Sequence, residues 1–256
     1  MIKVEPVRAF TDNYIWVIQN PDNNACLIVD PGDAKPVIDY LEANNLQPEA
    51  ILITHKHHDH VGGVKALQDR FDISAYGPAS EAARWIDINV NANSTLHFDN
   101  TEVQFSVIEL PGHTHGHIAY HTDGHLFCGD TLFVAGCGRV FEGTMAQMYQ
   151  SLETLADLDD KTLIYCAHEY TLANLKFALT VEPDNPDLKA FYDEATRLRA
   201  KDIPTVPSSI AQEKRINPFM RCKEVKVTQA AQQHGMIAGG DSVAVFTTLR
   251  QWKDNF

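Results

Sequence analysis

Four short apolar runs in this chain each lead to a side chain that can bind a metal ion. Their length and their bulky aliphatic residues are typical of buried β-strands. Because an imidazole or a carboxylate is costly to bury in the core of a strand, the four polar side chains are expected at the strand ends. The pattern therefore predicts a sheet assembly that gathers metal ligands along one edge. The four runs are 51–53 before His55, 107–110 before His113, 126–128 before Asp130 and 163–167 before His168.

The first run is followed by the densest group of ligand side chains, His55-Lys56-His57-His58-Asp59-His60. If the backbone is still extended, His55 and His57 point to the same side and two imidazoles can reach one metal ion. Asp59 and His60 then turn elsewhere, which favours a second ion beside the first. The alternative is a solvated, histidine-rich loop that is chemically inert. The ligand set contains no cysteine, which argues against a closed structural zinc site.

The chain is organised into two regions that differ in their pattern of apolar residues. Up to about residue 170, strand-like runs alternate with helical patterns, which predicts a layered α/β domain over 1–169. After Glu169 strand-like alternation nearly disappears, and helical stripes follow over 187–200 and Val243–Trp252. We therefore expect a smaller helical domain over 170–256. The predicted strands are Tyr14–Ile18, Cys26–Val29, Ala50–Thr54, Val103–Leu110, His117–His121, Leu126–Cys128 and Leu163–Cys166, and the other predicted helices are Pro36–Asn44, Gly62–Phe71 and Gln147–Leu158.

Charge and cysteine use exclude several classes of partner. The 34 acidic residues exceed the 21 Lys and Arg residues and give a net charge of −13, so nucleic acid and membrane surfaces are not expected partners. An anionic substrate needs a local basic patch. The five cysteines form no C-x-x-C pair, which suits reduced thiols, and the sequence has no h-region and no run near the roughly 18–20 apolar residues of a membrane span. We expect a cytoplasmic protein that is a monomer.

With its H-x-H-x-D-H segment and the later His113, Asp130 and His168, the sequence resembles the metallo-β-lactamase superfamily. Within it, the chain is most similar to the glyoxalase II enzymes, which are hydroxyacylglutathione hydrolases. The resemblance implies an αββα sandwich as the catalytic domain and a helical substrate-binding domain. The narrower match lies in 129–139, 141–144, 166–171 and 174–178, and in Arg250 and Lys253 near the end of the chain.

The resemblance implies two divalent metal ions per chain. Zinc is the expected metal, with iron or manganese as alternatives, because mixed imidazole and carboxylate ligands accept all three. The implied reaction is hydrolysis of S-D-lactoylglutathione to glutathione and D-lactate, the second step of methylglyoxal degradation, with Asp59 and Asp130 as catalytic ligands. By the same resemblance, His55, His57 and His113 would hold the first ion, Asp59, His60 and His168 the second, and Asp130 would bridge the two.

The resemblance also assigns glutathione binding to Arg139, Phe141, Tyr170, Arg250 and Lys253. Independently of it, Arg250 and Lys253 stand three residues apart and share one face of a predicted helix, where they can pair with carboxylates. The alternative is a solvated helix end with cations placed favourably on the helix dipole. Arg139 stands where the family often has lysine, and Phe141 where it often has tyrosine, so both departures bear on substrate affinity.

Other activities use similar ligand sets. A β-lactam hydrolase of the superfamily usually places a cysteine at the second metal, where this chain has Asp130, and is exported. A persulfide dioxygenase would use one iron held by two histidines and an aspartate, and would normally lack the helical extension. A regulatory or RNA-processing metal-binding module is opposed by the charge of −13 and by the complete set of ligands.

Overall fold

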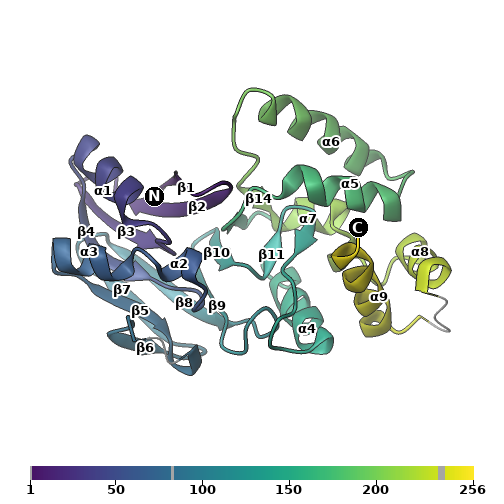
Figure 1. Cartoon of the computed structure of the whole chain (residues 1–256), viewed down its shortest axis with the longest axis horizontal. Coiled ribbons are helices and arrows are strands. Elements are labelled where there is room, and N and C mark those ends of the chain that lie inside the picture. The colour runs from purple at the N-terminus through teal and green to yellow at the C-terminus, as the bar shows by residue number, and fades with distance from the viewer. Residues whose placement is uncertain (1, 82–83, 236–239) are drawn as a thin grey trace. The chain divides into compact units, whose positions relative to one another are not determined.

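The computed structural model describes residues 2–81, 84–235 and 240–256, and the chain forms two compact units (Figure 1). Unit 1 comprises Met1–Glu109 and His115–Gly129, and unit 2 comprises Leu110–Thr114 and Asp130–Phe256. Along the chain, the two units meet at Glu109/Leu110, Thr114/His115 and Gly129/Asp130, whereas the sequence predicts a domain boundary at 169/170. The division into domains at 169/170 stays a prediction.

Unit 1 contains a six-stranded sheet in the order β1-β2-β3-β4-β5-β6. The first three strands pair antiparallel, and β3 to β6 pair parallel. Every residue of β2 and β3 is buried, as expected for strands covered on both faces. The strands are β1 (Lys3–Ala9), β2 (Asn13–Gln19), β3 (Ala25–Val29), β4 (Gln47–Leu52), β5 (Ser74–Pro78) and β6 (Ile88–Val90).

Short helices connect the parallel strands and cover one face of this sheet. In α1 (Ala34–Ala43) the side chain of Asp33 caps the first turn, and Val37 and Leu41 enter the core of the sheet. The α3 helix (Val64–Phe71) adds Val64 and Leu67 to the same core. The remaining short elements are α2 (His58–Val61) and the 3₁₀ turn η1 (Ala79–Glu81).

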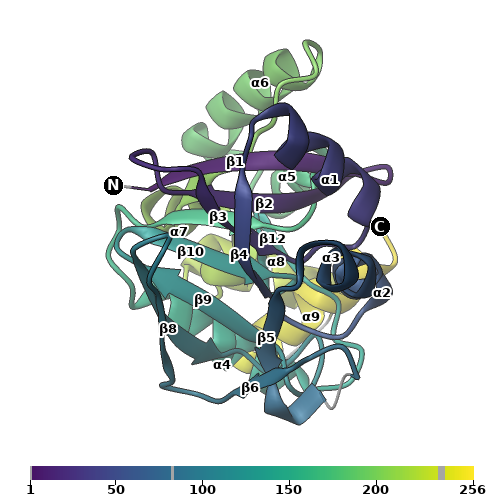
Figure 2. The same cartoon turned by 90° about the vertical axis from the view of Figure 1, so that its left-hand side faces the viewer.

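A second ladder of unit 1 is antiparallel, and its strands β8, β9 and β10 run side by side (Figure 2). Buried and solvent-accessible residues alternate along most of β8, the pattern of a strand with one covered face. The hydroxyl of buried Tyr120 lies 2.9 Å from the carbonyl oxygen of Ile53 and 3.1 Å from that of Tyr76, which ties this ladder to the first sheet. The strands are β7 (Thr95–Phe98), β8 (Val103–Glu109), β9 (Ile118–Thr122) and β10 (His125–Gly129).

Unit 2 is mainly helical. Thr144 and Gln147 form a capping box on α4, and the Asp241 side chain caps α9. A small core joins Ala135, Leu175 and Leu188 from three different segments. The helices are α4 (Met145–Ala156), α5 (Thr171–Val181), α6 (Pro186–Arg199), α7 (Ile210–Ile216), η2 (Pro218–Met220), α8 (Val225–Gly235) and α9 (Ser242–Asp254). The strands are β11 (Leu132–Phe133), β12 (Gly136–Cys137), β13 (Leu163–Cys166) and β14 (Ser208–Ser209).

Every predicted strand and helix is present, with ends shifted by a few residues. Each of the four apolar runs is a strand, and each predicted ligand follows its strand: His55 after β4, His113 after β8, Asp130 after β10 and His168 after β13. The elements that the sequence did not predict include β1, the short strands β5 to β7, and helices α5, α7 and α8.

Candidate active site

The predicted ligands of unit 1 lie between the end of β4 and the first turn of α2. His55 Nε2 is 3.0 Å from His57 Nδ1, so the two imidazoles converge as the i, i+2 spacing predicted. Two nitrogen ligands of one tetrahedral ion lie about 3.3 Å apart when each bond is about 2.0–2.1 Å long. The pair therefore has nearly the separation that a shared ion requires.

A buried carboxylate, Asp30, orients the histidines of unit 1. It follows β3 with a left-handed φ of 51° and accepts hydrogen bonds from the Thr54 amide (2.8 Å) and the Thr54 hydroxyl (2.6 Å). It also accepts one from His60 Nδ1 at 3.0 Å. A left-handed non-glycine residue is strained, and such strain concentrates at functional sites. The carboxylate thus lies behind the histidines and orients them through hydrogen bonds.

These bonds fix the tautomers of the two buried histidines. Because the Asp30 carboxylate can only accept, His60 carries its proton on Nδ1 and presents a bare Nε2. The single hydroxyl proton of Thr54 goes to Asp30, so Thr54 Oγ1, 3.1 Å from His55 Nδ1, accepts the proton of His55. Both rings therefore present Nε2 in the form that binds a metal.

Asp59 and His60 form a second pair of ligand side chains. Asp59 Oδ2 lies 3.5 Å from His60 Nε2, and the Asn13 side-chain amide donates to the same oxygen at 3.2 Å. Asp30, His55 and His60 also bring ligand atoms within 4.8 Å of one another. Since Asp30 already engages the far nitrogen of His60, its contacts are those of an orienting group.

In unit 2 the two oxygens of the Asp130 carboxylate face different histidines. Oδ2 is 3.4 Å from His113 Nε2, and Oδ1 is 3.4 Å from His168 Nε2. The carbonyl oxygen of Arg139 accepts the Nδ1 proton of His113 at 2.8 Å, which leaves its Nε2 bare as well. A carboxylate that faces one imidazole with each oxygen has the arrangement of a bridging ligand between two ions.

Glycines on either side of the Asp130 turn allow this close packing. Gly129 has φ +48°, and a Cβ there would lie 2.4 Å from Thr54 Oγ1. At Gly138 a Cβ would lie 1.9 Å from the Asp130 carbonyl oxygen. Both contacts are far shorter than real Cβ atoms show, so a side chain at Gly129 would displace the Thr54 side chain and one at Gly138 would displace the Asp130 backbone.

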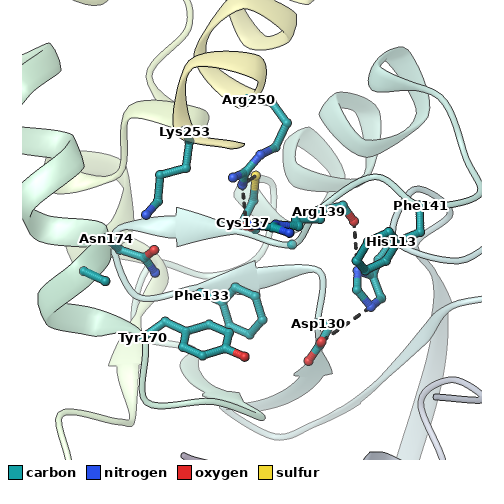
Figure 3. A pocket seen from close by; sticks show the side chains of 12 residues that line it. His113, Asp130, Phe133, Cys137, Arg139, Phe141, Tyr170, Asn174, Arg250 and Lys253 are labelled. Carbon is teal, nitrogen blue, oxygen red and sulfur yellow. Dashed lines mark hydrogen bonds and ion pairs between the residues drawn. The ribbon is translucent and has the colours of Figure 1, made fainter. Parts of the chain in front are cut away.

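A cavity of about 390 Å³ adjoins Asp130 in unit 2 (Figure 3). Its size falls in the range of small-molecule sites. Figure 3 shows Arg250 and Lys253 reaching from one helix toward the cavity, with Tyr170 and Phe133 across from them. The lining residues are His113, Asp130, Phe133, Cys137, Gly138, Arg139, Phe141, Tyr170, Ala173, Asn174, Arg250 and Lys253.

The two cations of α9 differ in their surroundings. Arg250 is 4% exposed, and its Nη1 donates to the Cys137 carbonyl oxygen at 2.7 Å. Lys253 Nζ lies 5.6 Å from the centre of the Phe177 ring, and burial, followed by the nearby Arg250, lowers the pKa of Lys253. The last turn of α9 is therefore not a fully solvated helix end, because both cations are partly desolvated at the cavity.

Aromatic rings flank the predicted ligands. Tyr170 stacks on His168 with ring centroids 4.7 Å apart and an interplanar angle of 4°. Phe141 is 61% exposed, and its ring meets the His113 ring edge-on with centroids 5.2 Å apart.

All five predicted substrate-binding residues line the cavity. Of the twelve predicted site residues, four belong to unit 1, namely His55, His57, Asp59 and His60, and the other eight belong to unit 2.

Sequence reasoning missed the residues that hold the hairpin of β11 and β12 beside the cavity. Buried Glu213 accepts from the Ala135 amide at 2.8 Å, and the Asn217 side chain donates to the Gly136 carbonyl oxygen at 2.9 Å. Asn174 donates to the Val134 carbonyl oxygen at 3.0 Å. Burial raises the pKa of Glu213 to about 7. A lone Glu in a helix carries no sequence signal for this contact, since it depends on a loop 78 residues away.

The five cysteines are buried and form no disulfide. Burial raises the pKa of Cys166 to about 12 and that of Cys137 above its usual value. Near neutral pH both thiols stay protonated, so neither is a nucleophile at this site.

Two family models divide the chain between them. Residues 9–168 match the metallo-beta-lactamase superfamily, and residues 169–256 match the hydroxyacylglutathione hydrolase C-terminus. A hydroxyacylglutathione hydrolase of Nitrosomonas eutropha is 51% identical over 256 residues, which is all of both chains. The chain belongs to the hydroxyacylglutathione hydrolase family. Membership confirms the predicted αββα fold and the helical C-terminal region.

Solved structures share this fold at lower identity. The BLEG-1 B3 metallo-beta-lactamase superposes with a TM-score of 0.64 and 26% identity, covering 86% of this chain and 99% of the other. ETHE1 from Myxococcus xanthus superposes with a TM-score of 0.65 and 25% identity. The alignment covers 85% of this chain and 83% of ETHE1.

Among the described residues, no helix has both the length and the apolar character needed to cross a membrane.

Proposed function

We propose that this chain hydrolyses S-D-lactoylglutathione to glutathione and D-lactate at a pair of metal ions. Family membership gives the reaction class, a glutathione thioester hydrolase. The observation that carries the site assignment is Asp130, whose two oxygens face two different imidazoles beside a cavity lined by three cations.

The donor set fits divalent ions. It consists of imidazoles and carboxylates without thiolate, and three of the histidines are held in the tautomer that presents Nε2. We propose His55, His57 and His113 for one ion, Asp59, His60 and His168 for the other, and Asp130 for both. Two such ions would supply a hydroxide near neutral pH and would polarise the thioester carbonyl. Zinc is our first choice, and iron and manganese suit the same donors.

The side chains of the chain itself bind and orient the substrate. Arg139, Arg250 and Lys253 place positive charge at the cavity, where the carboxylates of glutathione can be paired. Phe141 and Tyr170 offer apolar ring faces along the peptide. Phe141 has no hydroxyl, so this wall contributes packing and no hydrogen bond at that position.

Departure of the thiol needs no protonated side chain. A thiol of pKa about 8.5 leaves as a stable thiolate, unlike the amine released from an amide. Asp59 is held by Asn13 and by its own place in α2, so its carboxylate is oriented before substrate arrives. We propose that this pre-set geometry lets Asp59 help hold and orient the attacking hydroxide.

Turnover of S-D-lactoylglutathione, compared with a simple acyl thioester that lacks the glutathione carboxylates, tests the reaction and the carrier together. We expect efficient hydrolysis of the first substrate and a much higher KM for the second. Metal analysis of the active protein should give two equivalents per chain. A single iron with oxygen consumption and no thioester cleavage would instead identify a dioxygenase.

Further proposals concern the setting of the enzyme. We propose that the enzyme acts as a monomer, and light scattering of the active protein tests this. Buried cysteines without disulfides support the reducing cytoplasm as its compartment. The surplus of acidic residues supports a small-molecule substrate and no nucleic-acid partner.

A further inference from the structure

We propose that Asp254 is a built-in competitor for the glutathione carboxylates, which lowers the affinity of the cavity for substrate and product alike. The proposal rests on the function proposed above. It makes Asp254 a residue that acts through two arginines and touches no reacting atom.

One oxygen of Asp254 serves both arginines of the cavity. Oδ1 lies 3.0 Å from Arg250 Nη2 and 3.6 Å from Arg139 Nε. Arg250 is nearly fully buried, and its other terminal nitrogen is used by the Cys137 carbonyl oxygen. Asp254 therefore engages the guanidinium edge of Arg250 that Cys137 leaves available. A glutathione carboxylate that binds the same edge must displace this carboxylate.

The helix itself does not explain an aspartate at this position. Asp254 is the last residue of α9, where a negative charge meets the negative end of the helix dipole. Its pairing with Arg250 places the cation N-terminal to the anion at i, i+4, which is the weaker orientation. The side chain of Asp254 is 33% exposed, so it adds little apolar packing. Its ion pairs are with two of the three cations of the cavity, Arg250 and Arg139.

Such competition has a use in this reaction. Substrate and product carry the same glutathione carboxylates, so any contact to them binds both equally. Uniform binding lowers KM but does not raise kcat, and strong binding of the product slows its release. The carboxylate of Asp254 weakens the binding of substrate and of product by the same factor. It also keeps the two arginines aligned when no substrate is bound.

The test is Asp254→Asn in the full-length, metal-loaded enzyme. Asparagine keeps an oxygen that accepts from Arg250 but removes the charge. We expect the KM for S-D-lactoylglutathione and the inhibition constant of glutathione to fall together, by about two- to fivefold. The matched control is Asp39→Asn, which removes the partner of Lys35 on the exposed face of α1 and should change neither constant.

Two further measurements separate charge from structure. A thioester without carboxylates should keep its KM, and the gain for the glutathione thioester should shrink at high salt. Asp254→Ser, with thermal unfolding measured beside it, repeats the test in a second variant. A higher KM, an unchanged inhibition constant or a gain independent of salt would overturn the proposal. If the wild-type enzyme does not cleave S-D-lactoylglutathione at all, the proposed function fails instead.

Discussion

The ligand side chains of unit 1 and the cations of unit 2 are oriented by different kinds of contact. In unit 1 a single buried carboxylate, Asp30, fixes Thr54 and His60 through short hydrogen bonds. In unit 2 the arginines of the cavity share Asp254 at the partly exposed end of α9. Buried charge-assisted hydrogen bonds hold geometry strongly, whereas partly exposed ion pairs are weak and screened by salt. The first region should therefore govern metal binding and kcat, and the second should govern KM.

The largest effect is expected from Asp130→Ala, because one carboxylate serves both proposed ions. Its removal should release at least one metal equivalent and lower kcat by on the order of a thousandfold. Elemental analysis and initial rates measure the two effects on the same sample. Near-normal kcat with two retained ions would show that Asp130 is not the bridge.

A smaller loss is expected from Asp30→Asn, which keeps the shape of the side chain but removes its charge. Residues that orient metal-bound histidines typically change metal affinity or activity by about 10–100-fold. We expect metal affinity to weaken by that factor, measured by competition with a chelator, while KM stays within about twofold of wild type. Asp39→Asn serves as the surface control. A change confined to KM would contradict the division between the two regions.

Arg250→Ala together with Lys253→Ala should raise KM by about tenfold or more, since charge-assisted pairs contribute roughly 1.5–3 kcal/mol. The contacts are made equally in the ground state and the transition state, so kcat should change much less. A thioester without glutathione carboxylates should be hydrolysed almost normally.

The single variants sharpen this test. Arg250 is buried and holds the Cys137 carbonyl oxygen, so Arg250→Ala should also lower Tm. The Lys253 ammonium lies over the rings of Phe177 and Phe256, whereas Arg250 holds a backbone carbonyl oxygen, so Lys253→Ala should raise KM with a smaller change in Tm than Arg250→Ala. Equal losses on both substrates would show that the two residues support unit 2 and do not bind glutathione.

The strands and the ligand side chains could be predicted because each signal is local. Short runs of three to five residues that lead to His or Asp occupy one stretch of chain, and i, i+2 spacing is enough to predict that His55 and His57 converge. The missed helix α5 has no such signal, because Leu175, Phe177 and Ala178 make it apolar on several sides and blur its period.

The residues that orient the site were mostly hidden from sequence reasoning because their partners are remote. Glu213 contacts a loop 78 residues earlier, and Asn13 contacts Asp59 46 residues later. Arg250 and Lys253 were correctly placed on one helix face, but no local pattern distinguishes the buried arginine from the half-exposed lysine. Burial is set by the elements that pack around α9, and one helical stripe does not contain that information.

Substitutions at Glu213 should change substrate turnover least of all these variants. Glu213 is a buried carboxyl of unit 2, as Asp30 is of unit 1, but it holds a hairpin and no predicted metal ligand. Burial raises the pKa of Glu213 from 4.5 to about 7, although Ser208, Ala135 and Asn217 all donate to it. Below pH 4.5 the carboxyl is protonated in both the folded and the unfolded chain. Between about pH 4.5 and 7 only the folded chain keeps the proton, so this group makes stability fall as pH rises.

Glu213→Gln removes that titration while its side-chain oxygen can still accept from the Ala135 amide. The free energy of unfolding of the variant, measured relative to wild type, should therefore rise by up to about 3 kcal/mol from pH 4.5 to pH 7 and stay level above it. Glu213→Ala has no acceptor for the Ala135 amide and should be less stable than the glutamine variant at every pH. Denaturant unfolding of all three proteins at matched pH gives the curves. A constant difference between Glu213→Gln and wild type across this range would mean that Glu213 titrates normally, and that the hairpin of β11 and β12 is held by the amides of Asn174 and Asn217 without a cost for charge.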